Sequence, residues 1–447
     1  MTGGEILQRL SPLLRDTFTL TASSLLLRLL GLAFQSRMTR SIGAEGMGLL
    51  SLAMNAEALA VTLGSSGVRY SVTRLTAEEL SHPADGVRSI LRAAARFSML
   101  CSFTAAALLF CFAENLSAFA GDERIALSLR CFALGIPALA LNSILSGYFT
   151  AKLAPWKTGT AQIAEQLCLI LLTALLLPRV PKTRLDLCCA AIAVSGTASN
   201  LLSLLFSYLL YRYRNPLPAL RPGSVRKVGP RLLHLSLPLA FSGYARTALS
   251  TLQHLLVPKA LRRSGYGAEQ ALAVYGTVSG MVFPVLGFAS VFFSALSEML
   301  IPRLTAAQLR GDRRGMERSA ERILTACLLF SSLTSLLLYL LGPWLGQKLY
   351  RSGDAGLYIR VLAPLVTVMY LDSVVDGMLK GLGLQFSSMV INLTDAALTL
   401  ICVCVLLPRY GTAAYIGILY LSECFNFLLS FLRLRKELCF RLLAFRA

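Results

Sequence analysis

The chain has 447 residues, of which 55% are hydrophobic and 15% charged, and its mean hydropathy is +0.64. A soluble domain is usually about 45–50% apolar and about 25% charged, so this composition excludes an ordinary soluble domain. The formal net charge is +20. Because the basic residues follow a membrane-topology pattern, described below, we expect no nucleic-acid partner.

Apolar runs of about twenty residues recur along the whole chain, and a helix of that length crosses a hydrocarbon core of roughly 30 Å. The backbone must be helical there, because no water is present to satisfy it. The first fifteen residues are mixed and polar, and the first apolar run leads into Arg28 instead of a small-residue cleavage site, which predicts a retained first helix. In chain order the predicted helices are 14–36, 47–70, 90–112, 127–150, 159–178, 186–210, 232–257, 271–298, 320–342, 357–379, 386–407 and 412–432.

The predicted fold is an all-α polytopic membrane protein with about 12 transmembrane helices in two homologous six-helix lobes. The lobes are residues 1–210 and 231–447, and a basic cytoplasmic linker, 211–230, joins them. Internal similarity supports this division, because several polar residues recur 230 positions later. Arg130, Asn142, Ser143, Gly147, Glu165 and Pro178 recur as Arg360, Asp372, Ser373, Gly377, Asp395 and Pro408. An even number of helices gives the repeats the same orientation, with a substrate path expected between the lobes.

The larger share of the Lys and Arg residues lies in the tails and alternate loops that share one side of the predicted topology. The linker 211–230 and the loop from Arg303 to Arg322 are the most basic of these segments. Since positively charged loops remain in the cytoplasm, both termini are predicted to be cytoplasmic.

Charged residues within the predicted helices are candidates for function, because a charge at mid-bilayer costs roughly 2.5–3.5 kcal/mol without a partner or cavity. Arg28 and Arg246 lie near the middle of the first helix of each half. Two guanidinium groups facing one cavity suit an anionic substrate, while neutralisation by a carboxylate such as Glu57 or Glu298 is the alternative. Arg69 either joins the cavity or extends to the cytoplasmic surface. The predicted substrate-binding residues are Arg28, Arg246, Arg69, Arg74, Asn55 and Glu57.

A second group of charged residues is predicted to act in coupling or gating. Asp372, Asp376 and Lys380 share one helical face at spacings of four, as either a transport-face network or a structural ion-pair ladder. Glu165 and Asp395 occupy matching repeat positions, which favours helix-packing hydrogen bonds over a cation relay. Glu298 completes this group.

The sequence contains no recognisable enzyme or metal signature. No P-loop, GxSxG or HExxH motif is present, and no loop is long enough for a catalytic domain. The 11 cysteines lie in apolar runs without CxxC spacing, and the three histidines are scattered. We therefore expect no enzyme activity, no cofactor and no metal.

Several segments in both halves resemble the stage V sporulation protein B-like flippases of the multidrug/oligosaccharidyl-lipid/polysaccharide exporter superfamily. They are Arg28–Gly31, Gly43–Leu49, Val72–Glu78, Leu256–Leu261, Ala273–Gly276 and Leu300–Leu304. The resemblance implies a V-shaped pair of lobes that flips polyprenyl-diphosphate-linked oligosaccharide, such as peptidoglycan precursor lipid II, across the bacterial cytoplasmic membrane by alternating access. The expected partners are membrane lipids and, as a separate possibility, a cell-wall synthase.

The chain departs from that family pattern at three positions. A basic residue expected seven positions after Arg28 is Gln35, and prolines expected in the second helix are Asn55 and Arg69. These differences concern the substrate headgroup more than the fold.

Two other functions are the alternatives to a flippase. They are a cation-coupled multidrug antiporter of the same superfamily and a non-transporting partner of a cell-wall synthase. A membrane-embedded glycan polymerase or glycosyltransferase is disfavoured, because long extracytoplasmic loops are absent from the sequence.

Overall fold

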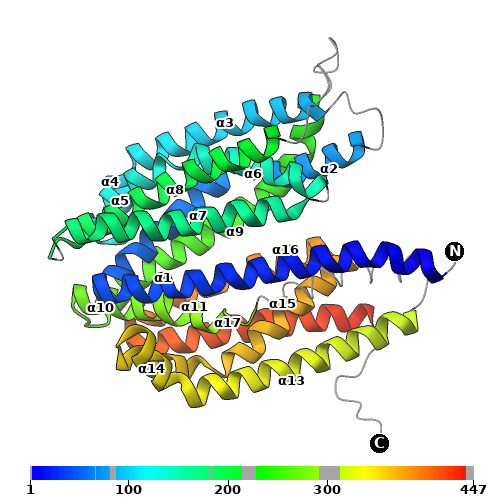
Figure 1. The fold of residues 1–447 in the computed structure, drawn as a ribbon. Helices are drawn as coiled ribbons and strands as arrows, with labels where there is room; N and C mark the ends of the chain where they lie inside the picture. Colours follow the sequence, from blue (N-terminus) through cyan, green and yellow to red (C-terminus); the bar gives the residue numbers. More distant parts are fainter. Residues whose placement is uncertain are drawn as a thin grey trace, which may run out of the picture. The chain divides into compact units, whose positions relative to one another are not determined.

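The computed structural model describes residues 3–65, 67–80, 87–152, 154–181, 183–213, 228–290 and 313–438 (Figure 1). Within these ranges every regular element is a helix. The elements are α1 (Gly3–Ser65), α2 (Val68–Leu80), α3 (Val87–Cys111), α4 (Ala113–Ala120), η1 (Glu123–Ile125), α5 (Ala126–Ala133), α6 (Ile136–Ala151), α7 (Pro155–Leu176), η2 (Leu177–Arg179), α8 (Leu185–Tyr213), α9 (Val228–Arg263), α10 (Ala268–Tyr275), η4 (Gly276–Val282), α11 (Phe283–Leu286), α13 (Arg313–Leu345), η5 (Gly346–Tyr350), α14 (Gly353–Leu362), α15 (Leu365–Gly381), α16 (Gln385–Val405) and α17 (Leu407–Glu437). The predicted all-α class is confirmed.

The helices are those of a multi-pass membrane protein. Among the described residues, seven helices are long and apolar enough to cross a membrane, or up to nine when two bent helix pairs are each counted as one span. One of the seven, Ser23–Glu79, contains the predicted range 47–70 and residues 23–36 of the predicted helix 14–36. The predicted range 232–257 lies within α9, and 271–298 falls on α10, η4 and α11 as far as residue 290.

The region around the second predicted helix differs from the sequence-based expectation. The predicted loop 37–46 is helical, and α1 changes direction at Gly43, whose φ of 71° lies in the left-handed region. The predicted helix 47–70 ends at Ser65, and a separate helix, α2, begins at Val68. Helix α2 was not predicted as a separate element, because its many polar residues made its apolar face difficult to recognise in the sequence. Val68, Val72 and Leu75 of α2 are buried in a core that α3 and α6 complete.

The predicted linker 211–230 is shorter in the structure than in the prediction. Helix α8 continues to Tyr213 and α9 starts at Val228, and residues 214–227 lie outside the described part of the chain. The segment that connects the two long helices, α8 and α9, is therefore 214–227 and lies within the predicted basic linker.

The chain divides into two compact units whose boundaries differ from the predicted lobes in two segments. Unit 1 comprises Met1–Phe34 and Leu49–Leu255, and unit 2 comprises Gln35–Gly48 and Leu256–Ala447. Most of α9 thus belongs to unit 1, while the part of α1 around its bend belongs to unit 2.

Hydrogen bonds explain why α9 is part of unit 1. The Ser236 hydroxyl donates to Ser71 Oγ at 2.8 Å. Thr251 Oγ1 donates to the backbone oxygen of Asn55 at 3.0 Å, and the Tyr244 hydroxyl donates to that of Leu63 at 3.3 Å. Polar contacts of this kind bind helices together where lipid supplies no hydrophobic driving force.

The segment Gln35–Gly48 is held in unit 2 by similar contacts. Arg40 Nη2 donates to the Lys348 carbonyl at 2.6 Å, and Ser36 Oγ donates to the Leu349 carbonyl at 2.5 Å. Backbones also approach closely at two glycines. A Cβ atom on Gly48 would lie 2.3 Å from the Leu272 carbonyl oxygen, and one on Gly276 would lie 2.1 Å from that of Ala44. Only glycine permits this crossing.

The two halves of the sequence contain matching local structures. Helices α5 and α6 meet at a bend of 47°, and α14 and α15 meet at a bend of 55°. The Arg130 guanidinium lies 5.7 Å from the centroid of the Phe110 ring, and the repeat-related Arg360 lies 4.6 Å from that of Tyr339. Shared bends and shared cation–π contacts support the internal duplication inferred from sequence.

Candidate functional site

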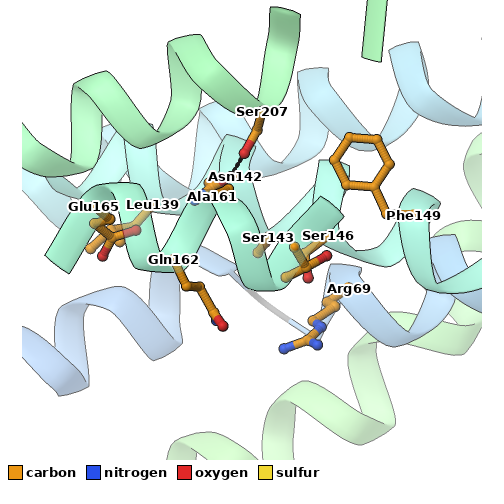
Figure 2. Close-up of a pocket in the computed structure, with 11 residues that line it drawn as sticks. Arg69, Leu139, Asn142, Ser143, Ser146, Phe149, Ala161, Gln162, Glu165 and Ser207 are labelled. Atoms are coloured by element: carbon orange, nitrogen blue, oxygen red, sulfur yellow. Dashed lines mark hydrogen bonds between the residues drawn. The ribbon is translucent and has the colours of Figure 1, made fainter. Parts of the chain in front are cut away.

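A polar cavity of about 180 Å³ lies inside unit 1, between α6, α7 and α8 and beside the start of α2. Figure 2 shows its lining side chains. They are Arg69, Leu139, Asn142, Ser143, Ser146, Phe149, Thr158, Ala161, Gln162, Glu165 and Ser207. Eight of these eleven residues are polar, which is costly within a bilayer unless they serve packing or a ligand.

Close backbone packing places Arg69 at one end of the cavity. Thr73 Oγ1 donates to the Arg69 carbonyl at 2.9 Å and to the Gly147 carbonyl of α6 at 3.1 Å. A Cβ on Gly147 would lie 2.6 Å from the Arg69 carbonyl oxygen, so glycine is required for α6 to approach this closely. Arg69 is therefore held next to Ser146, which precedes Gly147.

Arg69 and its neighbours have unused hydrogen-bonding capacity. Arg69 is exposed and forms no ion pair with any residue that the structure describes. The hydroxyls of Ser146 and Thr158 are buried and have no hydrogen-bond partner among the described residues. A buried unpaired hydroxyl costs about 1–3 kcal/mol, so a native protein retains one only for a reason.

A hydrogen-bonded network occupies the opposite end of the cavity. Asn142 Nδ2 donates to Ser203 Oγ at 3.0 Å. Ser207 Oγ donates to Asn142 Oδ1 at 2.8 Å (Figure 2). The Ser203 hydroxyl also donates to the carboxylate of Glu165. Glu165 lies seven residues after Thr158 on α7, about 10 Å along the helix axis. The cavity therefore has a cationic end and an acidic end.

The other predicted binding residues of unit 1 lie elsewhere. Arg28 and Arg246 are exposed, on α1 and α9, and both belong to unit 1 although each was predicted in a different lobe. Glu57 is half-buried on the part of α1 that follows the bend. Asn55 Nδ2 donates to the Ser51 carbonyl at 2.8 Å, and Arg74 pairs with Glu78 at 3.1 Å on an exposed face.

The predicted coupling residues of unit 2 take part in contacts between neighbouring helices. Lys380 Nζ lies 2.5 Å from Asp376, and Ser388 of α16 also donates to that carboxylate. Asp395 accepts from Ser422 Oγ of α17 at 2.9 Å. Asp372 is half-buried on α15, and Glu298 lies outside the described residues.

The repeat-related carboxylates Glu165 and Asp395 make the same kind of contact. Each accepts a hydrogen bond from a serine of the next long helix in its own half, Ser203 or Ser422. Each carboxylate therefore links two neighbouring helices of its own half.

Sequence reasoning missed the cavity hydroxyls of Ser146, Thr158 and Ser207. A signal was available only for Ser207, because Ser195, Ser199, Ser203 and Ser207 recur every four residues and are buried along one face of α8. A serine stripe at that spacing indicates a polar seam between helices, on which Asn142 and Glu165 converge.

Comparison with known proteins identifies the family. The family described as polysaccharide biosynthesis protein matches residues 13–308, which is more than half of the chain. The chain belongs to this family. It is also 24% identical over 392 residues to stage V sporulation protein B of Bacillus subtilis (strain 168), an alignment that covers 86% of this chain and 75% of that protein.

Solved structures share the fold of this family member. An inward-facing multidrug resistance MATE family transporter of the MOP superfamily has a TM-score of 0.70 at 15% identity, over 92% of this chain and 95% of the other. Its outward-facing counterpart has a TM-score of 0.64 at 16% identity, over 96% of this chain and 95% of the other. A MOP superfamily transporter from Pyrococcus furiosus has a TM-score of 0.62 at 15% identity, over 96% and 95%. These likenesses confirm the predicted exporter-superfamily fold.

Proposed function

We propose that this protein moves a lipid-linked oligosaccharide across the bacterial cytoplasmic membrane by alternating access. Membership of the polysaccharide biosynthesis protein family over residues 13–308 carries the proposal. The similarity to stage V sporulation protein B and the transporter fold support it. The substrate class is a polyprenyl diphosphate bearing sugars, with lipid II or a related peptidoglycan precursor as the first candidate.

The arginines of unit 1 supply the charge that such a substrate requires. Arg28 and Arg246 are exposed, and Arg69 lines the polar cavity. A guanidinium group binds phosphate oxygens in a bidentate manner and remains charged under all relevant conditions. We propose that Arg28 and Arg246 bind the diphosphate while the lipid tail remains in the bilayer.

The decisive experiment is a flipping assay with fluorescently labelled lipid II in proteoliposomes that contain the purified protein. We expect labelled lipid to reach the opposite leaflet faster than in protein-free liposomes. A parallel assay of proton- or sodium-driven drug efflux tests the antiporter alternative. Drug efflux without lipid movement would replace the proposal with antiport. Neither activity in a folded preparation would favour a non-transporting partner of a cell-wall synthase.

The membrane orientation gives a separate prediction. In a cysteine-free background, Ser224→Cys should react with a membrane-impermeant maleimide only after cells are permeabilised, because the basic linker is proposed to be cytoplasmic. Thr183→Cys, an exposed position between α7 and α8, should react in intact cells. Labelling of Ser224→Cys from outside intact cells would reverse the proposed orientation of both termini.

A further inference from the structure

The cavity in unit 1 has the composition of a binding site for one end of a substrate. We propose that it binds the glycosyl phosphate end of the substrate, with the sugar-linked phosphate of the diphosphate at Arg69 and the sugar directed toward Glu165. Arg28 and Arg246 then contact the lipid-linked phosphate. This inference rests on the proposed function, because it identifies where that substrate's headgroup is held. It concerns residues of unit 1 alone.

The phosphate end is defined by unused donors. The Arg69 guanidinium group has no ion-pair partner among the described residues. The buried hydroxyls of Ser146 and Thr158 have no hydrogen-bond partner among them. Ser146 is 8% exposed, so its hydroxyl is almost fully removed from solvent yet lines the cavity. A cation and hydroxyl donors in one recess are the groups that bind phosphate oxygens through charge-assisted hydrogen bonds.

An anion alone does not suit the end of the cavity that contains Glu165, because this carboxylate would repel it. Glu165 receives one hydrogen bond from Ser203, and a carboxylate has capacity for more. The Ser143 hydroxyl donates to the Ala140 carbonyl at 2.7 Å, which leaves its lone pairs to accept. Acceptors of this kind suit sugar hydroxyls, which are donors. The Gln162 amide, between Thr158 and Glu165 on α7, can contact either part of the ligand (Figure 2).

The polarity of the cavity therefore matches a ligand with phosphate at one end and hydroxyls at the other. The distance of about 10 Å between the ends suits a phosphate followed by a single sugar ring. The residue that binds the phosphate in this proposal is Arg69, at a position where the family resemblance predicts a proline. The proposed phosphate binding therefore depends on the arginine.

The test measures binding to the full-length protein in nanodiscs of phosphatidylcholine by isothermal titration calorimetry. The probes are N-acetylglucosamine 1-phosphate, N-acetylglucosamine and inorganic phosphate. We expect the sugar phosphate to bind more tightly than either fragment. Arg69→Gln should weaken its binding at least about tenfold, because a charge-assisted contact is lost. Arg96→Gln, an exposed arginine of α3 outside the cavity, should bind as the wild type does.

Two further variants serve as controls. One distinguishes an effect on binding from an effect on folding, and the other distinguishes recognition of the phosphate from recognition of the sugar. Ser146→Ala removes an unpaired buried hydroxyl, so it should keep or raise thermal stability while it weakens binding severalfold. Glu165→Gln should reduce the preference for the sugar phosphate over phosphate. Equal binding of phosphate and sugar phosphate by the wild type would overturn the proposal, and so would unchanged binding by Arg69→Gln. Displacement of the probe by phosphatidylglycerol in the nanodisc, with phosphate and sugar phosphate bound equally, would identify a lipid-headgroup site instead.

Lipid II flipping in the same preparations distinguishes the two proposals. If the wild type binds the sugar phosphate through Arg69 but moves no lipid, the transport proposal fails and the site stands. If it moves lipid while Arg69→Gln binds the sugar phosphate as the wild type does, the site fails alone.

Discussion

Replacing Gly276 with leucine will leave little correctly folded protein. A Cβ atom at this position would lie 2.1 Å from the Ala44 carbonyl oxygen and 2.4 Å from the Gly48 backbone nitrogen. Both neighbours are backbone atoms, so a rotamer change cannot relieve the clash. Overpacking of this kind costs typically 1–3 kcal/mol and occasionally more, and a leucine at a backbone crossing belongs to the upper part of that range. Gly276→Ala should lower the stability by about 2–3 kcal/mol.

The measurement is the monodisperse fraction in size-exclusion chromatography, together with thermal unfolding in detergent. Gly417→Ala is the matched control, since beyond the nearby backbone of α17 itself no atom lies within 4 Å of a Cβ built on this helical glycine. That variant should be as stable as the wild type or more stable by up to about 1 kcal/mol, because alanine favours a helix. Normal folding of Gly276→Leu would show that the crossing of α1 with α10 and η4 is not required.

Replacing Arg28 with alanine will nearly abolish lipid II flipping without unfolding the protein. The proposed contact is bidentate and charge-assisted, and truncating one partner of such a pair costs about 2 kcal/mol or more, which is at least about thirtyfold in affinity. Arg28→Lys retains the charge but loses the planar fork, so it should reduce flipping only partly. Arg28 is exposed, and exposed substitutions usually change stability by less than about 0.5 kcal/mol.

The assay compares initial flipping rates in proteoliposomes at matched protein content, with unfolding temperatures measured in parallel. Arg96→Ala serves as the control for the loss of an exposed arginine of unit 1 outside the proposed site. Arg246→Ala should resemble Arg28→Ala if the two guanidinium groups share one diphosphate. A folded Arg28→Ala protein that flips at the wild-type rate would assign Arg28 a structural role and leave transport to other cations.

The helical architecture could be predicted from local sequence because a bilayer restricts the choices. A nearly uncharged run of about twenty residues has one stable conformation there. The predicted range 186–210 accordingly lies on the single long helix α8, and residues 386–405 of the predicted range 386–407 lie on α16. The duplication was visible for a related reason. Arg130 and Arg360 lie 230 positions apart in the sequence, and each contacts an aromatic ring.

Polar segments were less predictable, because their structure depends on what they pack against. The sequence of α2 contains Arg69, Arg74 and Glu78 among its apolar residues, and it was expected to end a helix and begin a loop. Its Val68, Val72 and Leu75 become a helical face only when α3 and α6 are present to bury them.

The sequence by itself determined the all-helical membrane class, the repeated spacing of residues between the two halves and the resemblance to a flippase family, since these depend on composition, spacing and local motifs. The tertiary structure decided which helices share a unit. Contacts hundreds of residues apart, such as Arg40 with Lys348 and Ser236 with Ser71, assign the bend of α1 to unit 2 and most of α9 to unit 1. It also decided that Arg69 shares a cavity with Ser146, Thr158 and Glu165. Helical periodicity specifies the face on which a residue lies, but the partner of that face is fixed only when the helices pack.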